Sequence, residues 1–68
     1  MKGKIVQVMG PVVDVFFDSY SPSIYEAIRV DELHVILEVQ QLLDNGVVRT
    51  VAMDSTEGMV RGMECTAT

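Results

Sequence analysis

The sequence predicts a small all-β domain built from about six short strands. Two runs near its start, Ile5–Met9 and Val12–Phe17, are rich in β-branched and aromatic residues, which favour strands over helices. Two turn-forming dipeptides, Gly10-Pro11 and Asn45-Gly46, separate such runs. Because no internal repeat, low-complexity tract or linker interrupts the chain, we expect one domain over residues 1–68.

The first two runs are expected to pair through a turn at Gly10-Pro11. Pro11 cannot donate a backbone hydrogen bond, so it suits the first residue of a strand or an edge. The segment Asp18–Ser23 that follows collects small polar residues and a proline, which is the composition of an exposed loop.

The stretch Ile24–Leu43 is compatible with a helix or with strands. It contains many helix-favouring residues, and Asn45-Gly46 could cap a helix at its end. Between Leu33 and Gln40, however, apolar residues recur with a period near two, and Val30-Asp31-Glu32 breaks the helical stripe. We favour strands, with Asn45-Gly46 as a type I′ hairpin turn joining Val35–Leu43 to Val47–Met53.

The second half of the chain predicts two further strands around a turn. In Val47–Met53 one face carries the small residues Val48, Thr50 and Ala52, which would suit a narrow barrel interior. Asp54 stands three residues before Glu57, as in a capping box, and predicts one helical turn that Gly58 ends. Gly62 then releases the chain into a last strand at Met63–Thr66.

Composition excludes several classes of function. Five Lys and Arg against ten Asp and Glu give a net charge of -5, which would repel a phosphate backbone and argues against nucleic acid. Apolar runs of four residues or fewer are far short of the roughly 20 that cross a bilayer, so any membrane connection would go through a partner. Met1 is followed by Lys2-Gly3-Lys4 without a signal or transit segment, so we expect the chain to start at a mature domain.

No residue is assigned to catalysis, to cofactor binding or to a metal. Asp14, Asp54 and Glu57 are the candidate paired carboxylates, but no nucleophile or pocket accompanies them, and we interpret them as solvated acids. His34 has no second ligand at metal spacing and is expected on a surface strand. Cys65, the only cysteine, is interpreted as a small core residue.

Arginine, methionine and glycine residues receive structural interpretations. Arg49 and Arg61 could pair with carboxylates across an interface, but pairing within the domain, with Asp54 or Glu57, is favoured. Of the five methionines, Met9 and Met53 are expected to fill the core. Gly58 and Gly62 lack the lysine and the hydroxyl residue that accompany the glycines of a phosphate-binding loop. They are interpreted as glycines that tight turns require.

Three segments together resemble one protein family. They are GKIVQVMGPVVDVFF at 3–17, LEVQQLL at 37–43 and VVRTVAMDSTEGMVRGMEC at 47–65, of which AMDSTEGMVRG is the most specific. Their order and wording are similar to the N-terminal domain of the beta subunit of F-type rotary ATP synthases. The match covers nearly the whole chain and is least constrained over 18–36.

The resemblance implies a closed six-stranded barrel in a ring of alternating alpha and beta barrels on top of the catalytic head. The implied job is assembly, with neighbouring alpha subunits as partners, in a soluble head on the bacterial cytoplasmic side or in an organelle matrix or stroma. The membrane, and a coupling proton or sodium ion, would be reached only through the whole complex.

The family's catalytic apparatus has no counterpart in these 68 residues. The G-x-x-x-x-G-K-[ST] loop, the catalytic glutamate and the arginine are absent, and the chain stops at Thr68, near the barrel's end. A second departure is the short loop before His34. We therefore expect no cofactor and no enzyme activity in this domain, with ATP or ADP and magnesium bound by the full-length family member.

An alternative is a stand-alone OB-like barrel that binds an oligonucleotide or another ligand. Such a barrel needs aromatic stacking platforms and a basic groove. The aromatic residues available to it are Phe16, Phe17, Tyr20 and Tyr25.

Overall fold

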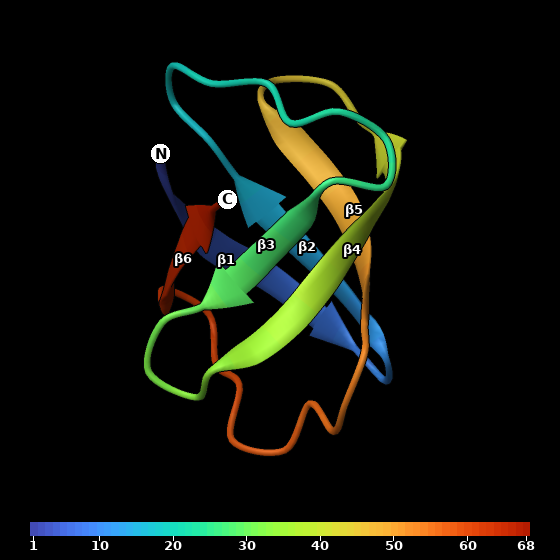
Figure 1. Ribbon diagram of the computed structural model, residues 1–68, viewed down its shortest axis with the longest axis vertical. Coiled ribbons are helices and arrows are strands. Elements are labelled where there is room, and N and C mark those ends of the chain that lie inside the picture. Colours follow the sequence, from blue (N-terminus) through green and yellow to red (C-terminus); the bar gives the residue numbers. More distant parts are fainter.

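The computed structural model describes residues 1–68 as a closed barrel of six antiparallel strands (Figure 1). Around the barrel the strands follow the order β1-β2-β5-β4-β3-β6, and β6 pairs with β1 to complete the circle. The all-β prediction and the closed barrel are confirmed. The strands are β1 (Lys2–Met9), β2 (Val12–Phe16), β3 (Ala27–Val30), β4 (Val35–Leu42), β5 (Val47–Ala52) and β6 (Glu64–Ala67).

The barrel closes at a short seam where the two ends of the chain meet. Thr66 of β6 stands opposite Lys2 of β1, and the Ala67 N–H donates to the Met1 carbonyl at 2.8 Å. On its other side β6 pairs with β3, where Val30 faces Cys65. In Figure 1 both ends of the chain therefore lie on the same side of the molecule, beside β6.

Two irregularities in strand pairing assist closure. The β1–β2 register shifts between Ile5 and Gln7, and the β4–β5 register shifts between Val39 and Gln41. An extra residue in one strand bends it and increases its twist, which lets short strands curl into a closed sheet.

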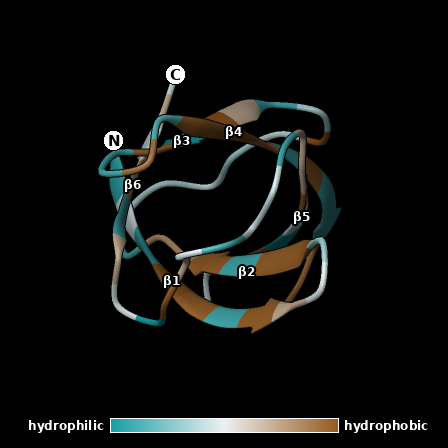
Figure 2. Cartoon of the chain, turned by 90° about the horizontal axis from the view of Figure 1, so that it is seen from below, coloured by the Kyte–Doolittle hydropathy of each residue, from teal (hydrophilic) through white to brown (hydrophobic).

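The interior is filled by side chains that alternate along every strand. Figure 2, a view along the barrel, shows the six strands arranged around this core. The small face predicted for Val47–Met53 is confirmed, because Val48 and Thr50 are buried. Thr50 is polar, but its hydroxyl donates to the Val13 carbonyl at 2.7 Å. The buried hydrophobic residues are Ile5, Val13, Val15, Phe17, Ile28, Val30, Leu37, Val39, Val48, Met59 and Cys65.

The strand interpretation of Ile24–Leu43 is confirmed, although the sequence did not place β3 separately. Four residues, Ala27–Val30, form this strand, and such a short segment shows too few alternations to stand out. His34 lies in the turn between β3 and β4 and not on a strand as expected. Its φ of 58° and the bond from its N–H to the Val30 carbonyl at 2.8 Å belong to that turn.

The hairpin turn at Asn45-Gly46 is confirmed. Both residues have positive φ, 61° and 80°, as a type I′ turn requires. The Val47 N–H donates to the Asp44 carbonyl at 3.3 Å, and β4 ends one residue earlier than predicted, at Leu42.

The helical turn predicted at Asp54–Gly58 is wrong. The Asp54 carboxylate accepts from the adjacent Ser55 N–H at 2.7 Å, and the Ser55 hydroxyl accepts from the Glu57 N–H at 3.0 Å. Such local bonds offer the backbone an alternative to a helix, so no capping box forms.

Two successive tight turns replace the helix and close this end of the barrel. In the first, the Met59 N–H donates to the Thr56 carbonyl at 3.0 Å, and in the second the Met63 N–H donates to Val60 at 3.3 Å. The third residue of each turn is a glycine with φ of 87° or 96°, a backbone conformation that other residues adopt at a cost. Met59 is buried and Met63 packs against the core, which the turns make possible.

The methionine prediction is wrong for the two residues that it named. Met9 is 42% exposed and Met53 is 56% exposed, whereas Met59 fills the core. Strand parity explains the difference, because Val8 and Ala52 point toward the core and their neighbours must point outward.

The loop Asp18–Ser23 is confirmed as a connection but is not wholly exposed. Pro22 is fully buried, and the Tyr20 ring meets the buried Phe17 ring edge-on, with 5.8 Å between centroids. The Tyr20 hydroxyl donates to the Glu26 carboxylate at 2.7 Å, which ties the loop to the start of β3.

Gly46 should tolerate alanine less well than Gly10, although both have positive φ. A Cβ at Gly46 would lie 2.7 Å from the Phe17 carbonyl oxygen, whereas a Cβ at Gly10 has nothing within 4 Å. We expect Gly10→Ala to lower the free energy of unfolding by about 1–2 kcal/mol, the cost of left-handed backbone. Gly46→Ala should lower the free energy of unfolding by about 1–3 kcal/mol more than Gly10→Ala does, because of the clash with the Phe17 carbonyl. Urea denaturation measures both variants. Equal losses in the two variants would contradict this account of the hairpin.

Candidate functional site

The acidic residues considered for catalysis lie in different parts of the barrel. Asp14 lies on β2, Asp54 lies in the loop after β5, and Glu57 lies in the first tight turn. No hydrogen bond joins any two of them. His34 is exposed in the β3–β4 turn, and no group of three His, Cys, Asp or Glu side chains is close enough to hold a metal ion.

Asp14 and Arg49 form an ion pair on the outside of the barrel. The Arg49 Nε and Nη2 atoms donate to the two carboxylate oxygens of Asp14, each at 3.0 Å. The expectation of a solvated Asp14 is wrong, because only 3% of the residue is exposed. The carboxylate raises the pKa of the Arg49 guanidinium by accepting its hydrogen bonds.

Pairing of Arg49 within the domain is confirmed, but its partner is not Asp54 or Glu57. The two residues stand directly opposite each other where β2 pairs with β5. These strands are far apart in the sequence, so only the topology reveals the contact. The alternation of side chains along each strand does give a partial indication, because it places Asp14 and Arg49 on the outer side of the barrel.

An apolar outer face extends over four neighbouring strands, β1, β2, β5 and β4. Met9 pairs with Val12, Val12 pairs with Val51, and all three point away from the core. Ile36 is outward on β4, and its carbonyl accepts from the Met53 N–H at 2.9 Å, which brings the two residues together. We define the apolar outer face as Met9, Val12, Ile36, Val51 and Met53.

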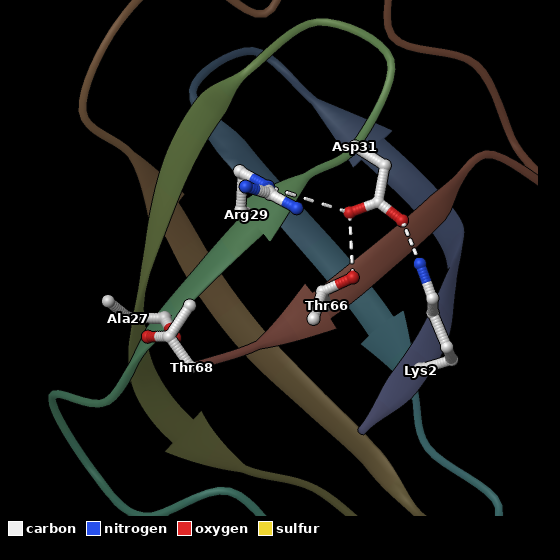
Figure 3. A network of polar contacts seen from close by, with 6 residues as sticks. All are labelled: Lys2, Ala27, Arg29, Asp31, Thr66 and Thr68. Atoms are coloured by element: carbon white, nitrogen blue, oxygen red, sulfur yellow. Dashed lines mark hydrogen bonds and ion pairs between the residues drawn. The ribbon is translucent and has the colours of Figure 1, made fainter.

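A charged network lies on the outer surface where β3, β6 and β1 adjoin (Figure 3). The Asp31 carboxylate accepts hydrogen bonds from the Lys2 ammonium and from the Thr66 hydroxyl, the latter at 2.7 Å, and lies 3.7 Å from Arg29 Nε. It therefore joins β1, β3 and β6 at the closing seam. Those bonds, led by that from Lys2, hold the pKa of Asp31 below its ordinary value. In a ring of six strands β5 lies opposite β6 and β2 opposite β3, so Val12 and Val51 lie on the far side of the barrel from the seam, while Ile36 at the margin of the apolar face stands opposite Arg29 of the network.

An open groove of about 700 Å³ runs beside this network between the β3–β4 turn and the second tight turn. Three of its lining residues, Asp31, Glu32 and Glu64, are acidic, and one is basic, Arg61. Arg61 makes none of the three ion pairs of the barrel, so the pairing expected for it is not found. An acid-lined groove repels phosphate groups, so its charge does not suit a nucleotide.

The aromatic residues do not share one surface. Phe17 points into the core while Phe16 points outward, and Tyr25 is exposed in the loop before β3. The pKa of Tyr20 is raised because its hydroxyl donates to the Glu26 carboxylate. Among these side chains Phe17 is unavailable for stacking on a ligand.

Cys65 is confirmed as a core residue. It is fully buried on β6, and burial raises the pKa of its thiol to about 12. A thiol that stays protonated is a poor nucleophile, so this side chain serves packing.

One protein-family model matches almost the whole chain. It is described as the ATP synthase alpha/beta family, beta-barrel domain, and it covers residues 5–68. The closed six-stranded barrel agrees with that description. Separately, no helix in the structure has the length and apolarity that crossing a membrane requires.

Removing Arg49 should destabilise the barrel because the buried Asp14 carboxylate then loses its partner. We expect Arg49→Met to lower the free energy of unfolding by about 1–3 kcal/mol in urea denaturation. The double variant Asp14→Leu/Arg49→Met, which replaces both groups by apolar ones, should recover most of that loss. A double variant as unstable as the single one would mean that the loss comes from packing and not from the unpaired charge.

The Asp31 network should make stability depend on pH in the acid range. The pKa of Asp31 is lower in the folded state than its ordinary value of 3.8, so its contribution is complete above that value and is lost as the pH falls through the folded pKa. At pH 7 Asp31→Asn should therefore be less stable than the parent, and the difference should shrink below pH 4 in thermal melts. The neighbouring exposed acid provides a control, and Glu32→Gln should show no such convergence.

Proposed function

Because this chain belongs to the ATP synthase alpha/beta family as its beta-barrel domain, we propose that it is the N-terminal assembly collar of an F-type beta subunit. Membership supports a role in assembly for either type of subunit. The choice of the beta subunit rests on the wording of two segments, LEVQQLL at 37–43 and AMDSTEGMVRG at 52–62.

The second of these segments has a definite structural role in the barrel. It begins at the end of β5 and continues through both tight turns, with Gly58 and Gly62 at the positions of positive φ. Met59 from the same segment enters the core. The most specific part of the resemblance thus seals one end of the barrel, which supports an architectural function.

The barrel would hold its place in a ring of alternating alpha and beta barrels through its outer faces. A closed barrel has no free strand edge, so neighbours must meet side chains and loops and not add a strand. The exposed apolar flank and the charged flank provide two such surfaces. In this proposal ATP or ADP, magnesium and the catalytic residues belong to the rest of a full-length subunit, in a head that reaches the membrane and its proton or sodium path only through the complex.

The isolated protein should not hydrolyse ATP. We expect no phosphate release when the pure 68-residue protein is incubated with magnesium and ATP, because none of its acids is paired with a nucleophile or a phosphate-binding loop. An intact F-type catalytic head serves as the positive control in the same assay.

Two results would count against the collar proposal. Phosphate release that remains proportional to the protein through purification would indicate an enzyme. Saturable micromolar binding of single-stranded DNA at low salt, followed by fluorescence anisotropy, would favour the OB-like alternative.

A further inference from the structure

We propose that two copies of this chain can exchange residues 59–67, so that β6 of each copy closes the barrel of the other. The partner is a second copy of the chain, and the surface that receives it is the slot between β1 and β3 that β6 fills in a single copy. We call residues 59–67 the closing segment. The inference goes beyond the proposed function and does not depend on it.

β6 is the one strand of the barrel that belongs to no hairpin. The other five strands each pair with a neighbour in sequence, since β1 pairs with β2, β3 with β4, and β4 with β5. β6 pairs only with β1 and β3, which are both remote in the sequence. Because no connecting turn sets these two pairings, β6 of a second copy can form them equally well.

The slot selects a strand with the composition of β6. On its inner side it holds the buried Cys65, which stands opposite Gly3 of β1 and Val30 of β3. On its outer side the Asp31 carboxylate accepts from the Thr66 hydroxyl at 2.7 Å (Figure 3). A strand that enters the slot therefore needs a small buried residue followed by a hydroxyl, and a second copy supplies both in the same register.

The closing segment begins at Met59 because the chain is fixed to the barrel from there on. The Met59 side chain is buried in the core. The Gly62 N–H donates to the Ile5 carbonyl at 2.7 Å, and the Ile5 N–H donates to the Met63 carbonyl at 2.9 Å. These contacts join the segment to β1, so the same contacts can form on β1 of a second copy.

Residues 54–58 form a hinge in front of the closing segment. None of the five is buried, and four are exposed. Their hydrogen bonds are local, apart from the one that the Thr56 hydroxyl donates to the Gly10 carbonyl at 2.9 Å. The hinge therefore loses few bonds when it straightens, and five extended residues span about 17 Å.

Concentration and the conformation of the hinge decide between the two forms, because both contain the same strand pairings. A short tether holds the closing segment near its own slot at an effective concentration of roughly 1 mM, which favours the single copy below that value. Gly58 has a φ of 87° in the closed hinge, a conformation that other residues adopt at a cost. A side chain at this position therefore penalises the closed hinge but not a straightened one.

Gly58→Ala tests the exchange, with Gly62→Ala as its matched control. Gly62 has a φ of 96°, but it lies in the closing segment, which is the same in both forms. Neither added Cβ makes a close contact, since the nearest atom at Gly58 is a Leu33 methyl at 3.8 Å and nothing lies within 4 Å at Gly62. The proteins are refolded from urea and analysed by size-exclusion chromatography with light scattering. Gly58→Ala should become half dimeric at a concentration at least tenfold below that of the parent, and Gly62→Ala within twofold of it.

A pair of cysteines across the seam identifies which copy supplies β6. Lys4 and Glu64 are exposed and stand directly opposite each other in the β1–β6 pairing. In Lys4→Cys/Glu64→Cys, oxidised after the two peaks are separated, the monomer should form its disulfide within the chain and the dimer between chains. A non-reducing gel distinguishes the two. Cys65 points into the core and is not available to either cysteine.

The rate of exchange should depend on the Asp31 network, although the final proportion of dimer should not. Asp31→Asn weakens the seam equally in both forms, so it should speed interconversion at least threefold and change the proportion of dimer less than twofold. Glu32→Gln, at the adjacent acid outside the network, should change neither quantity.

Three results would overturn the inference. They are a Gly58→Ala protein that stays monomeric above about 1 mM, a dimer whose cysteines are linked within each chain, and equal dimerisation of Gly58→Ala and Gly62→Ala. Circular dichroism confirms that each variant is folded. If Gly58→Ala does not fold, the Lys4→Cys/Glu64→Cys protein refolded above about 1 mM decides by the same gel, and the absence of a covalent dimer would then overturn the inference.

Discussion

The closing seam formed by β6 is the constraint on which the rest of the molecule depends. This strand has only four residues, yet it satisfies the hydrogen-bonding edges of both β1 and β3. Without it two strand edges would be open to other chains, and the inner face of the sheet would lose Cys65. The Asp31 carboxylate adds side-chain bonds from Lys2 and Thr66 across the same three strands.

Closure also determines how the outside of the barrel can be used. Once every backbone edge is paired, only outward side chains can distinguish one flank from another, and strand parity decides which they are. Parity assigns Val13, Val15, Leu37 and Val39 to the core and leaves Met9, Val12, Ile36 and Val51 outside. The circular strand order then places β2 and β5 half a turn from β3 and β6, and the apolar and charged surfaces meet where Ile36 stands opposite Arg29. A domain of this size can thus close its own hydrogen-bonding edges and still carry an apolar and a charged outer surface.

Local patterns in the sequence predicted what depends on neighbours along the chain. β-Branched runs and period-two alternation identified the longer strands, and Asn45-Gly46 identified its hairpin, because each preference acts within a few residues. Arg49 was predicted to pair with the wrong acids, because β2, which carries its partner Asp14, becomes a neighbour of β5 only through the topology. The prediction of a helical turn was wrong because the side chains of Asp54 and Ser55 accept hydrogen bonds from the nearby backbone. The prediction for Met53 was wrong because it followed residue type, whereas the alternation along the strand places this side chain outside.

The meeting of the two chain ends at the seam has a mechanical consequence. β1 and β6 are antiparallel and their outermost pair, Lys2 and Thr66, lies at the ends of the chain. A force that pulls the two ends apart would break the hydrogen bonds between β1 and β6 one after another, starting at that pair, and would open the barrel along this seam. A force applied across the walls would have to deform many bonds at once. Tension between the termini therefore loads the β1–β6 seam one bond at a time, although that seam is what closes the barrel.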